Sequence, residues 1–196
     1  MTRRVLMFMT AVAVMTAIAV LAPVARAQRG GPVGLAQGLQ GAYAGLKSNL
    51  TQAAEIVPET GYGLKPSTMQ EVRTYGQVIG HVADAQFGQC SGALGTANPN
   101  QGNSLEAPAK SRADVIKGLA DSFALCDKAF ETLTDQNASE MIPNGRGGQT
   151  ARAVALLGVI AHGNEMYGVS TVYQRAQNIV PPSTAARGRG RGGRGN

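Results

Sequence analysis

The chain has 196 residues, of which 15% are charged and 5% aromatic, and its formal net charge is +6 at pH 7. The positive excess lies at the two ends: three of the 18 basic residues precede residue 28 and four follow residue 186, which leaves 11 basic against 12 acidic residues between them. A near-neutral body offers no basic stripe to a phosphate backbone, which argues against a folded nucleic-acid-binding domain, and its length suits a single domain with one core.

The first 27 residues have the pattern of a secretory signal. Arg3 and Arg4 precede an apolar run over 5–21, and an Ala-x-Ala sequence follows it. This pattern predicts cleavage before Gln28 and export to the periplasm or the extracellular space, with an uncleaved membrane anchor as the alternative. Paired arginines also fit a loose twin-arginine signal, but ordinary export needs the same charges.

Apolar residues then recur at helical spacing in four segments, bounded by Gly, Pro or Asn, and no run alternates as a strand does. The predicted helices span residues 35–57, 68–94, 111–134 and 149–178. We expect Ser67 or Thr68 to cap the second helix, Ser111 to cap the third, and the Pro181-Pro182 pair to prevent continuation of the fourth. The chain from 28 to 186 is therefore predicted to be an all-α domain.

Two segments outside these helices have distinct compositions. Residues 95–110, between the second and third helices, are rich in turn-forming residues and too numerous for a tight hairpin, so we expect them to cross one end of the bundle. Residues 187–196, RGRGRGGRGN, contain no apolar side chain and are predicted to be a disordered tail. Such a tail is either simply solvated or a contact for an anionic envelope surface, with nucleic acid as a lower-ranked partner.

The only two cysteines, Cys90 and Cys126, fall on the second and third predicted helices. In an exported protein they are able to form a disulfide, which would tie these helices together. The alternative is that both are small buried apolar side chains, as free cysteines commonly are.

Two stretches resemble one known family. Residues 161–184, AHGNEMYGVSTVYQRAQNIVPPST, resemble the last helix of the DinB/YfiT-like metalloenzyme superfamily, and residues 72–91, VRTYGQVIGHVADAQFGQCS, resemble its second helix. The resemblance implies a four-helix bundle in up-down-down-up order with a long crossover between helices 2 and 3. It also implies a metal site built from one histidine on helix 2 and an HxxxH pair on helix 4. Together with the signal-like N-terminus, the resemblance predicts a secreted member of the family.

In this chain the residues at those metal positions are His81 on the second helix and His162 with Met166 on the fourth, and there is no third histidine. Imidazole nitrogens favour Zn, Ni, Fe or Cu, whereas a thioether prefers soft ions. Three outcomes are open at this point: Glu165 or Asp84 supplies an oxygen ligand, Met166 binds a soft metal, or no metal is bound.

Other polar residues near these histidines are candidates for a pocket. Gln77 and Asp84 lie one helical turn on either side of His81. Tyr173 and Arg175 lie on the part of the fourth helix most like the family, where the arginine is suited to an anionic group. Core packing and helix capping explain these residues equally well.

The sequence supports two functions. The first is an exported bundle without an assigned molecular activity, which retains a degenerate His/His/Met site and binds a metal or a small ligand. The alternative is a metal-dependent enzyme of the DinB type, a thiol transferase or isomerase. The resemblance also implies a homodimer. No phosphate loop, activated nucleophile or CxxC pair is present in the sequence.

Overall fold

The computed structural model describes residues 32–108, 110–144 and 147–192. The chain divides into two units, Met1–Val33 and Gly34–Asn196, and the helices and strands described below belong to the second. The predicted signal, residues 1–27, lies outside the described residues. Within the described ranges, no helix is both long enough and apolar enough to cross a membrane.

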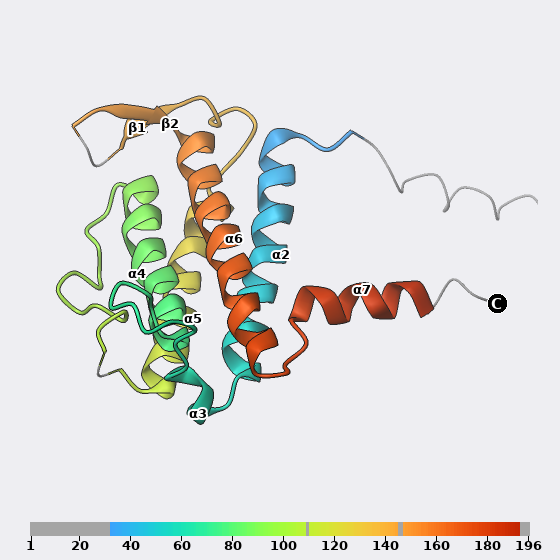
Figure 1. Cartoon of the computed structure of the whole chain (residues 1–196). Coiled ribbons are helices and arrows are strands. Elements are labelled where there is room, and N and C mark those ends of the chain that lie inside the picture. The colour runs from blue at the N-terminus through green and yellow to red at the C-terminus, as the bar shows by residue number, and fades with distance from the viewer. Residues whose placement is uncertain (1–31, 109, 145–146, 193–196) are drawn as a thin grey trace, which may run out of the picture. The chain divides into compact units, whose positions relative to one another are not determined.

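Four long helices form the bundle (Figure 1). They are α2 (Leu35–Ile56), α4 (Tyr75–Leu94), α5 (Arg112–Glu131) and α6 (Arg152–Ala176). The shorter elements are helix α3 (Glu59–Tyr62), the antiparallel pair β1 (Met141–Pro143) and β2 (Gln149–Ala151), and helix α7 (Pro182–Gly192). The predicted all-α class is confirmed.

The directions of the helices follow from their contacts. The disulfide Cys90–Cys126 and the hydrogen bond from Ser122 to Gln86 both join residues of α4 and α5 that are 36 positions apart in the sequence. A constant separation means that both helices run in the same direction, so α4 and α5 are parallel. Between α4 and α6, by contrast, the start of one helix meets the end of the other, because Arg152 donates to the Ala93 carbonyl. Helix α2 is also antiparallel to α4, because the Tyr75 hydroxyl at the start of α4 donates to the Ala53 carbonyl near the end of α2. The order is therefore up-down-down-up, as the family resemblance implies (Figure 1).

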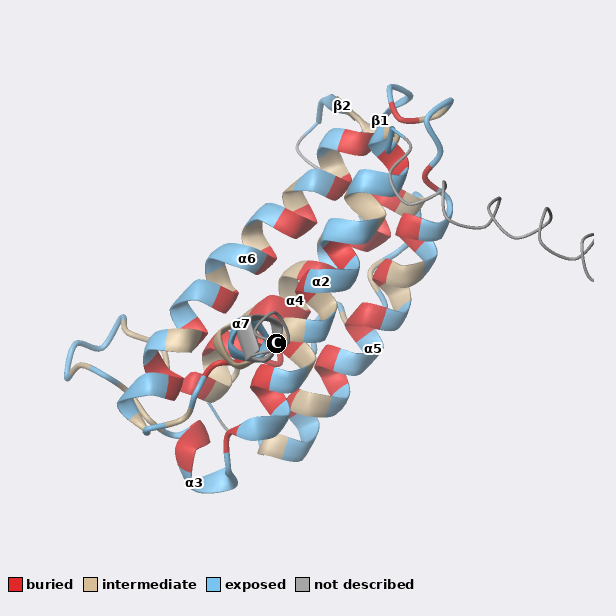
Figure 2. Ribbon diagram, turned by 90° about the vertical axis from the view of Figure 1, so that its right-hand side faces the viewer, coloured by how far each residue is buried: buried red, intermediate tan, exposed pale blue. Residues whose placement is uncertain are grey.

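Each long helix turns one apolar face inward, and the buried residues of the four helices meet along the axis (Figure 2). Leu50 of α2, Ile79 of α4, Phe123 of α5 and Leu156 of α6 are all almost completely buried. Burying side chains of this size stabilises a fold by about 1.5–3 kcal/mol each before entropy is counted. The core rather than intrinsic helix propensity holds glycine-rich α2 in place, because glycine weakens an isolated helix.

The N-caps confirm the predicted start of α5 and show that α4 starts later than predicted. Ser111 accepts from the Asp114 amide while the Asp114 carboxylate accepts from the Ser111 amide, which is the predicted capping box of α5. Helix α4 begins at Tyr75 rather than near residue 68, because Thr74 forms a complete capping box with Gln77. The prediction for this helix start was therefore wrong by about two turns.

The chain after α6 also differs from prediction. Helix α6 ends at Ala176, and Pro182 begins α7, which continues to Gly192 through the first part of the segment expected to be disordered. Proline fits the first turn of a helix because the missing N–H has no partner there anyway. Tyr167 of α6 accepts a hydrogen bond from the Ser183 amide at 2.9 Å and so fixes the start of α7. The β1–β2 hairpin was not predicted, since strands of three residues are too short to show alternation.

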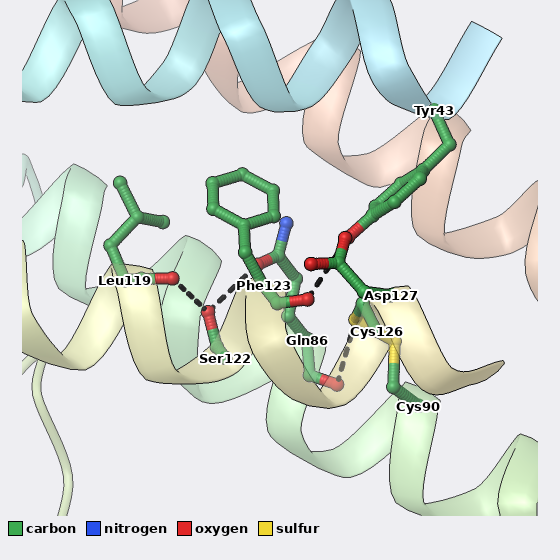
Figure 3. The surroundings of a disulfide bond; sticks show 8 residues. All are labelled: Tyr43, Gln86, Cys90, Leu119, Ser122, Phe123, Cys126 and Asp127. Atoms are coloured by element: carbon green, nitrogen blue, oxygen red, sulfur yellow. Dashed lines mark hydrogen bonds between the residues drawn. A yellow bond between two sulfur atoms is a disulfide. The ribbon is translucent and has the colours of Figure 1, made fainter. Parts of the chain in front are cut away.

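A disulfide between Cys90 and Cys126 joins the parallel helices α4 and α5, with a Cα–Cα distance of 5.1 Å (Figure 3). Beside it the Ser122 hydroxyl donates to Gln86 Oε1 at 2.8 Å, and Tyr43 of α2 donates to Asp127 of α5 at 2.8 Å. The predicted bridge is confirmed, and the alternative of two free buried thiols is excluded.

Removing the disulfide is expected to destabilise the bundle substantially. The bridge closes a segment with a sequence separation of 36, for which the chain-entropy model gives about 4 kcal/mol. We expect the double substitution Cys90→Ala and Cys126→Ala to lower the free energy of unfolding in urea by about 2–4 kcal/mol. Dithiothreitol should lower that of the wild type and leave that of the variant unchanged; equal sensitivity of both proteins would contradict the assignment.

Candidate metal centre

The two histidines of the chain meet between α4 and α6. His81 of α4 and His162 of α6 have ring centroids 5.2 Å apart and lie edge to face. About a quarter of each side chain is exposed, 26% for His81 and 25% for His162. The antiparallel pairing of α4 with α6 brings together two residues that are far apart in the sequence.

The crossover between α4 and α5 lies against these same two helices, where Leu105 contacts Gly80 and Gly118, and Asp84 of α4 holds it there. The Asp84 carboxylate accepts hydrogen bonds from the Leu105 and Glu106 amides at 2.9 and 3.1 Å and from the Ser104 hydroxyl at 2.8 Å. It also accepts from the Asn100 side chain at 2.9 Å. Because parallel helices need a connection that returns along their whole length, this carboxylate fixes a segment that would otherwise have few partners.

Leu105 packs into a space between α4 and α5 that two glycines leave open. It is 8% exposed. A Cβ at Gly80 would collide with the Leu105 backbone, and a Cβ at Gly118 would collide with its side chain. Gly80 and Gly118 therefore allow the loop to approach both helices closely, since any larger residue would push it outward.

The close approach of the loop brings Glu106 to His81. Glu106 Oε2 lies 2.8 Å from His81 Nδ1, and Glu106 Oε1 accepts from Arg73 Nε at 2.6 Å. Burial raises the pKa of the Glu106 carboxyl, but hydrogen bonds from Arg73 and His81 outweigh burial and hold that pKa below its usual value. Glu106 is therefore a carboxylate near neutral pH, shared between a guanidinium and an imidazole.

His162 has a different environment. Its Nε2 is buried and forms no hydrogen bond among the described residues. Its Nδ1 lies 3.8 Å from Glu165 Oε2, too far for a hydrogen bond, and the Glu165 side chain is 70% exposed. Burial lowers the pKa of His162 and the neighbouring His81 lowers it further, while the Glu165 charge opposes them. His162 is therefore held as a neutral imidazole with an unpaired buried nitrogen.

The remaining candidates from the sequence have mainly structural contacts. Met166 is partly buried against the core. Gln77 completes the cap of α4, while the Tyr173 hydroxyl donates to the Arg73 carbonyl at 2.7 Å. Arg175 donates to Thr171 of α6 and to Thr184 of α7, and both hydrogen bonds are exposed. The sequence predicts that Asp84 lines a pocket or supplies a ligand oxygen. In the structure its carboxylate accepts hydrogen bonds from the crossover loop.

No group of three His, Cys, Asp or Glu side chains within the described ranges is arranged to hold a metal ion. The two imidazole rings are the candidate metal ligands that the fold brings together, and the buried Nε2 of His162 has no hydrogen-bond partner among the described residues. Imidazole suits Zn, Ni, Fe and Cu, so the donor chemistry fits the metals that the family resemblance implies, but with fewer strong ligands.

Fold and site together define an up-down-down-up four-helix bundle with a histidine pair between its second and fourth long helices. Residues 42–165 match the family model of the DinB superfamily, and the chain belongs to this superfamily. No curated protein matches it significantly.

Solved structures share the fold at low sequence identity. A DinB-like protein from Bacillus cereus ATCC 10987 is 17% identical with a TM-score of 0.62, over 74% of this chain and 94% of that one. A DinB-like protein from Bacillus subtilis is 14% identical with a TM-score of 0.57, over 73% and 94% of the two chains. A conserved protein from Enterococcus faecalis is 12% identical with a TM-score of 0.58, over 74% and 97%.

Sequence reasoning missed Arg73 and Glu106. Glu106 lies in a polar loop, where an acidic residue carries no periodic signal, and Arg73 lies within a segment expected to be helical. The one available signal was Leu105, an isolated large apolar residue in the crossover, next to Glu106. A buried anchor in a polar loop indicates that its neighbours are held close to the fold.

The close approach of the loop is testable with two glycines of the same helix. We expect Gly80→Ala to displace the loop, lowering the free energy of unfolding by about 1–3 kcal/mol and increasing hydrogen exchange at residues 104–106. Gly88→Ala is the matched control, because a Cβ there meets no atom within 4 Å. The control should be neutral or more stable by about 0.5–1 kcal/mol. Equal effects at both positions would contradict the packing described.

The lowered pKa of His162 predicts a pH dependence of stability. Below the ordinary value of 6.5 the unfolded chain takes up a proton at this residue that the folded chain does not. The free energy of unfolding should therefore fall as pH decreases from 7.5 to 5.5. In His162→Gln this contribution disappears and the slope becomes smaller. Urea unfolding with a chelator present measures the pH dependence of the free energy of unfolding for the wild type and for the variant. Identical slopes in the two proteins would contradict the lowered pKa of His162.

Proposed function

We propose that this protein is an exported member of the DinB superfamily that binds a late transition-metal ion weakly through His81 and His162, without catalysing a reaction. The observation that carries the proposal is the 5.2 Å separation of the two rings, together with the buried, unpartnered Nε2 of His162. A buried polar nitrogen without a partner is costly, and a metal ion is one partner that satisfies it.

The ligand set supports exchangeable binding. A metal ion retained firmly by a protein usually has at least three strong protein ligands, and only two imidazoles come together here. Met166, four residues after His162, is the third candidate ligand. A His/His/Met set would favour a soft ion such as Cu(I) over zinc or nickel, because thioether sulfur is a soft donor. Weak binding with a soft preference fits a binding protein better than a metal-dependent enzyme.

Export is supported by the disulfide as well as by the N-terminal sequence. Disulfides persist in oxidising compartments such as the periplasm and are rare in the cytosol. Low-molecular-weight thiols, which a thiol transferase or isomerase of the DinB type would use, are chiefly cytosolic, so an exported location also favours binding over thiol transfer.

Metal titration of the chelator-treated protein tests this proposal. We expect one equivalent of Cu(I) or Zn(II) to bind the wild type, and His81→Ala and His162→Gln each to weaken binding at least about tenfold. Met166→Leu should weaken Cu(I) binding selectively and leave Zn(II) binding nearly unchanged. Circular dichroism checks that each variant folds. Wild-type affinity in either histidine variant, or no binding by the wild type, would refute the proposal.

A further inference from the structure

Glu106 is the carboxylate of the crossover loop that contacts His81. We propose that Glu106 is a positioning residue: it fixes the ring of His81 in the tautomer protonated at Nδ1, which leaves the Nε2 lone pair free to bind a metal ion. The effect of Glu106 on metal binding rests on the proposed function. The position of the proton on His81 does not, because it is a property of the metal-free protein.

The geometry fixes the position of the proton on a neutral His81 ring. A carboxylate oxygen 2.8 Å from Nδ1 requires a proton between the two atoms, since two lone pairs at that distance would repel. Arg73 Nη2 lies 3.5 Å from the same nitrogen, but it is also a donor, and the Arg73 side chain already donates to Glu106 at 2.6 Å. The Arg73 guanidinium and the His81 ring therefore both donate to the Glu106 carboxylate.

Glu106 is held in place independently of His81. Its amide donates to Asp84, as does the amide of Leu105, and Leu105 is packed between Gly80 and Gly118. Its second oxygen is engaged by Arg73. The carboxylate therefore acts as a fixed acceptor rather than a mobile surface group. Glu165, beside the other histidine, is mostly exposed and too distant for a hydrogen bond, so only His81 is held in this way.

A carboxylate on the far nitrogen of a ligating imidazole orients the ring and makes the other nitrogen more basic, and its loss typically lowers metal affinity by about 10- to 100-fold. Because this site lacks a third strong ligand, such support would matter more here than in a site with a full ligand set. Glu106 would thus make up part of the affinity lost with the missing histidine without itself binding the metal.

Nitrogen NMR of the two ring systems tests the tautomer directly. The chain contains only His81 and His162, so protein labelled with 15N-histidine gives four ring-nitrogen signals, assigned by His162→Gln. With chelator at pH 8, we expect His81 to be protonated at Nδ1. Glu106→Leu should shift the proton toward Nε2, whereas Glu106→Gln, which keeps an acceptor oxygen, should largely retain the Nδ1 proton. Glu131→Leu, on the exposed surface of α5, is the control and should leave the His81 signals unchanged.

Metal titration of the same proteins then separates the two proposals. We expect Glu106→Leu to weaken Zn(II) binding by about 10- to 100-fold, and Glu106→Gln to weaken it less. A wild-type His81 protonated at Nε2, or no change of tautomer in Glu106→Leu, would overturn the role of Glu106. If the tautomer is as expected but the wild type binds no metal, the positioning of His81 stands and the proposed function fails. Equal Zn(II) affinity in wild type and Glu106→Leu would overturn the contribution to binding.

Discussion

The parallel pairing of α4 and α5 is the constraint on which the rest of the structure depends. A helix of 20 residues is about 30 Å long, so a chain that enters the next helix in the same direction must first travel back over that distance. The return segment has almost no secondary structure to satisfy its backbone. The protein solves this with one carboxylate and one apolar side chain: Asp84 accepts from the loop amides, and Leu105 fills the space beside Gly80.

That structural solution also determines the chemistry of the candidate site. Once the loop is bound to α4 by Asp84, the residue after Leu105 comes within hydrogen-bond distance of His81, one turn away from Asp84 on the same helix. Three polar residues from two segments, Arg73, His81 and Glu106, then form a connected group at the edge of the core. His162, from α6, adds a neutral imidazole whose buried Nε2 has no hydrogen-bond partner among the described residues. The site is therefore a consequence of how the crossover is packed.

The fold was largely predictable from the sequence, and the site only in part. Helical periodicity, the Ser111 cap and the two family-like stretches identified the four long helices and the histidine pair, because these signals are local or carried by a helix face. The start of α4 was misplaced because Ser67 and Thr68 are as good caps as Thr74 by residue type, and only the reciprocal bonds with Gln77 distinguish them. Glu106 could not be predicted, because its role depends on a long-range contact made by a loop without periodicity.

The disulfide sets a fixed point along α4 that limits how the chain can change in length. Since Cys90 is bonded to α5, a residue inserted or deleted between His81 and Cys90 would rotate His81 by about 100° relative to the bridge and turn it away from α6. The start of the crossover, between the Gly95 cap of α4 and Asn100, carries no such restriction, because extra residues there can extend outward while Asp84 and Leu105 still hold the end that reaches the site. Length variation among close relatives of this chain is therefore expected to concentrate at residues 96–99 and to be absent between the histidine and the cysteine of α4.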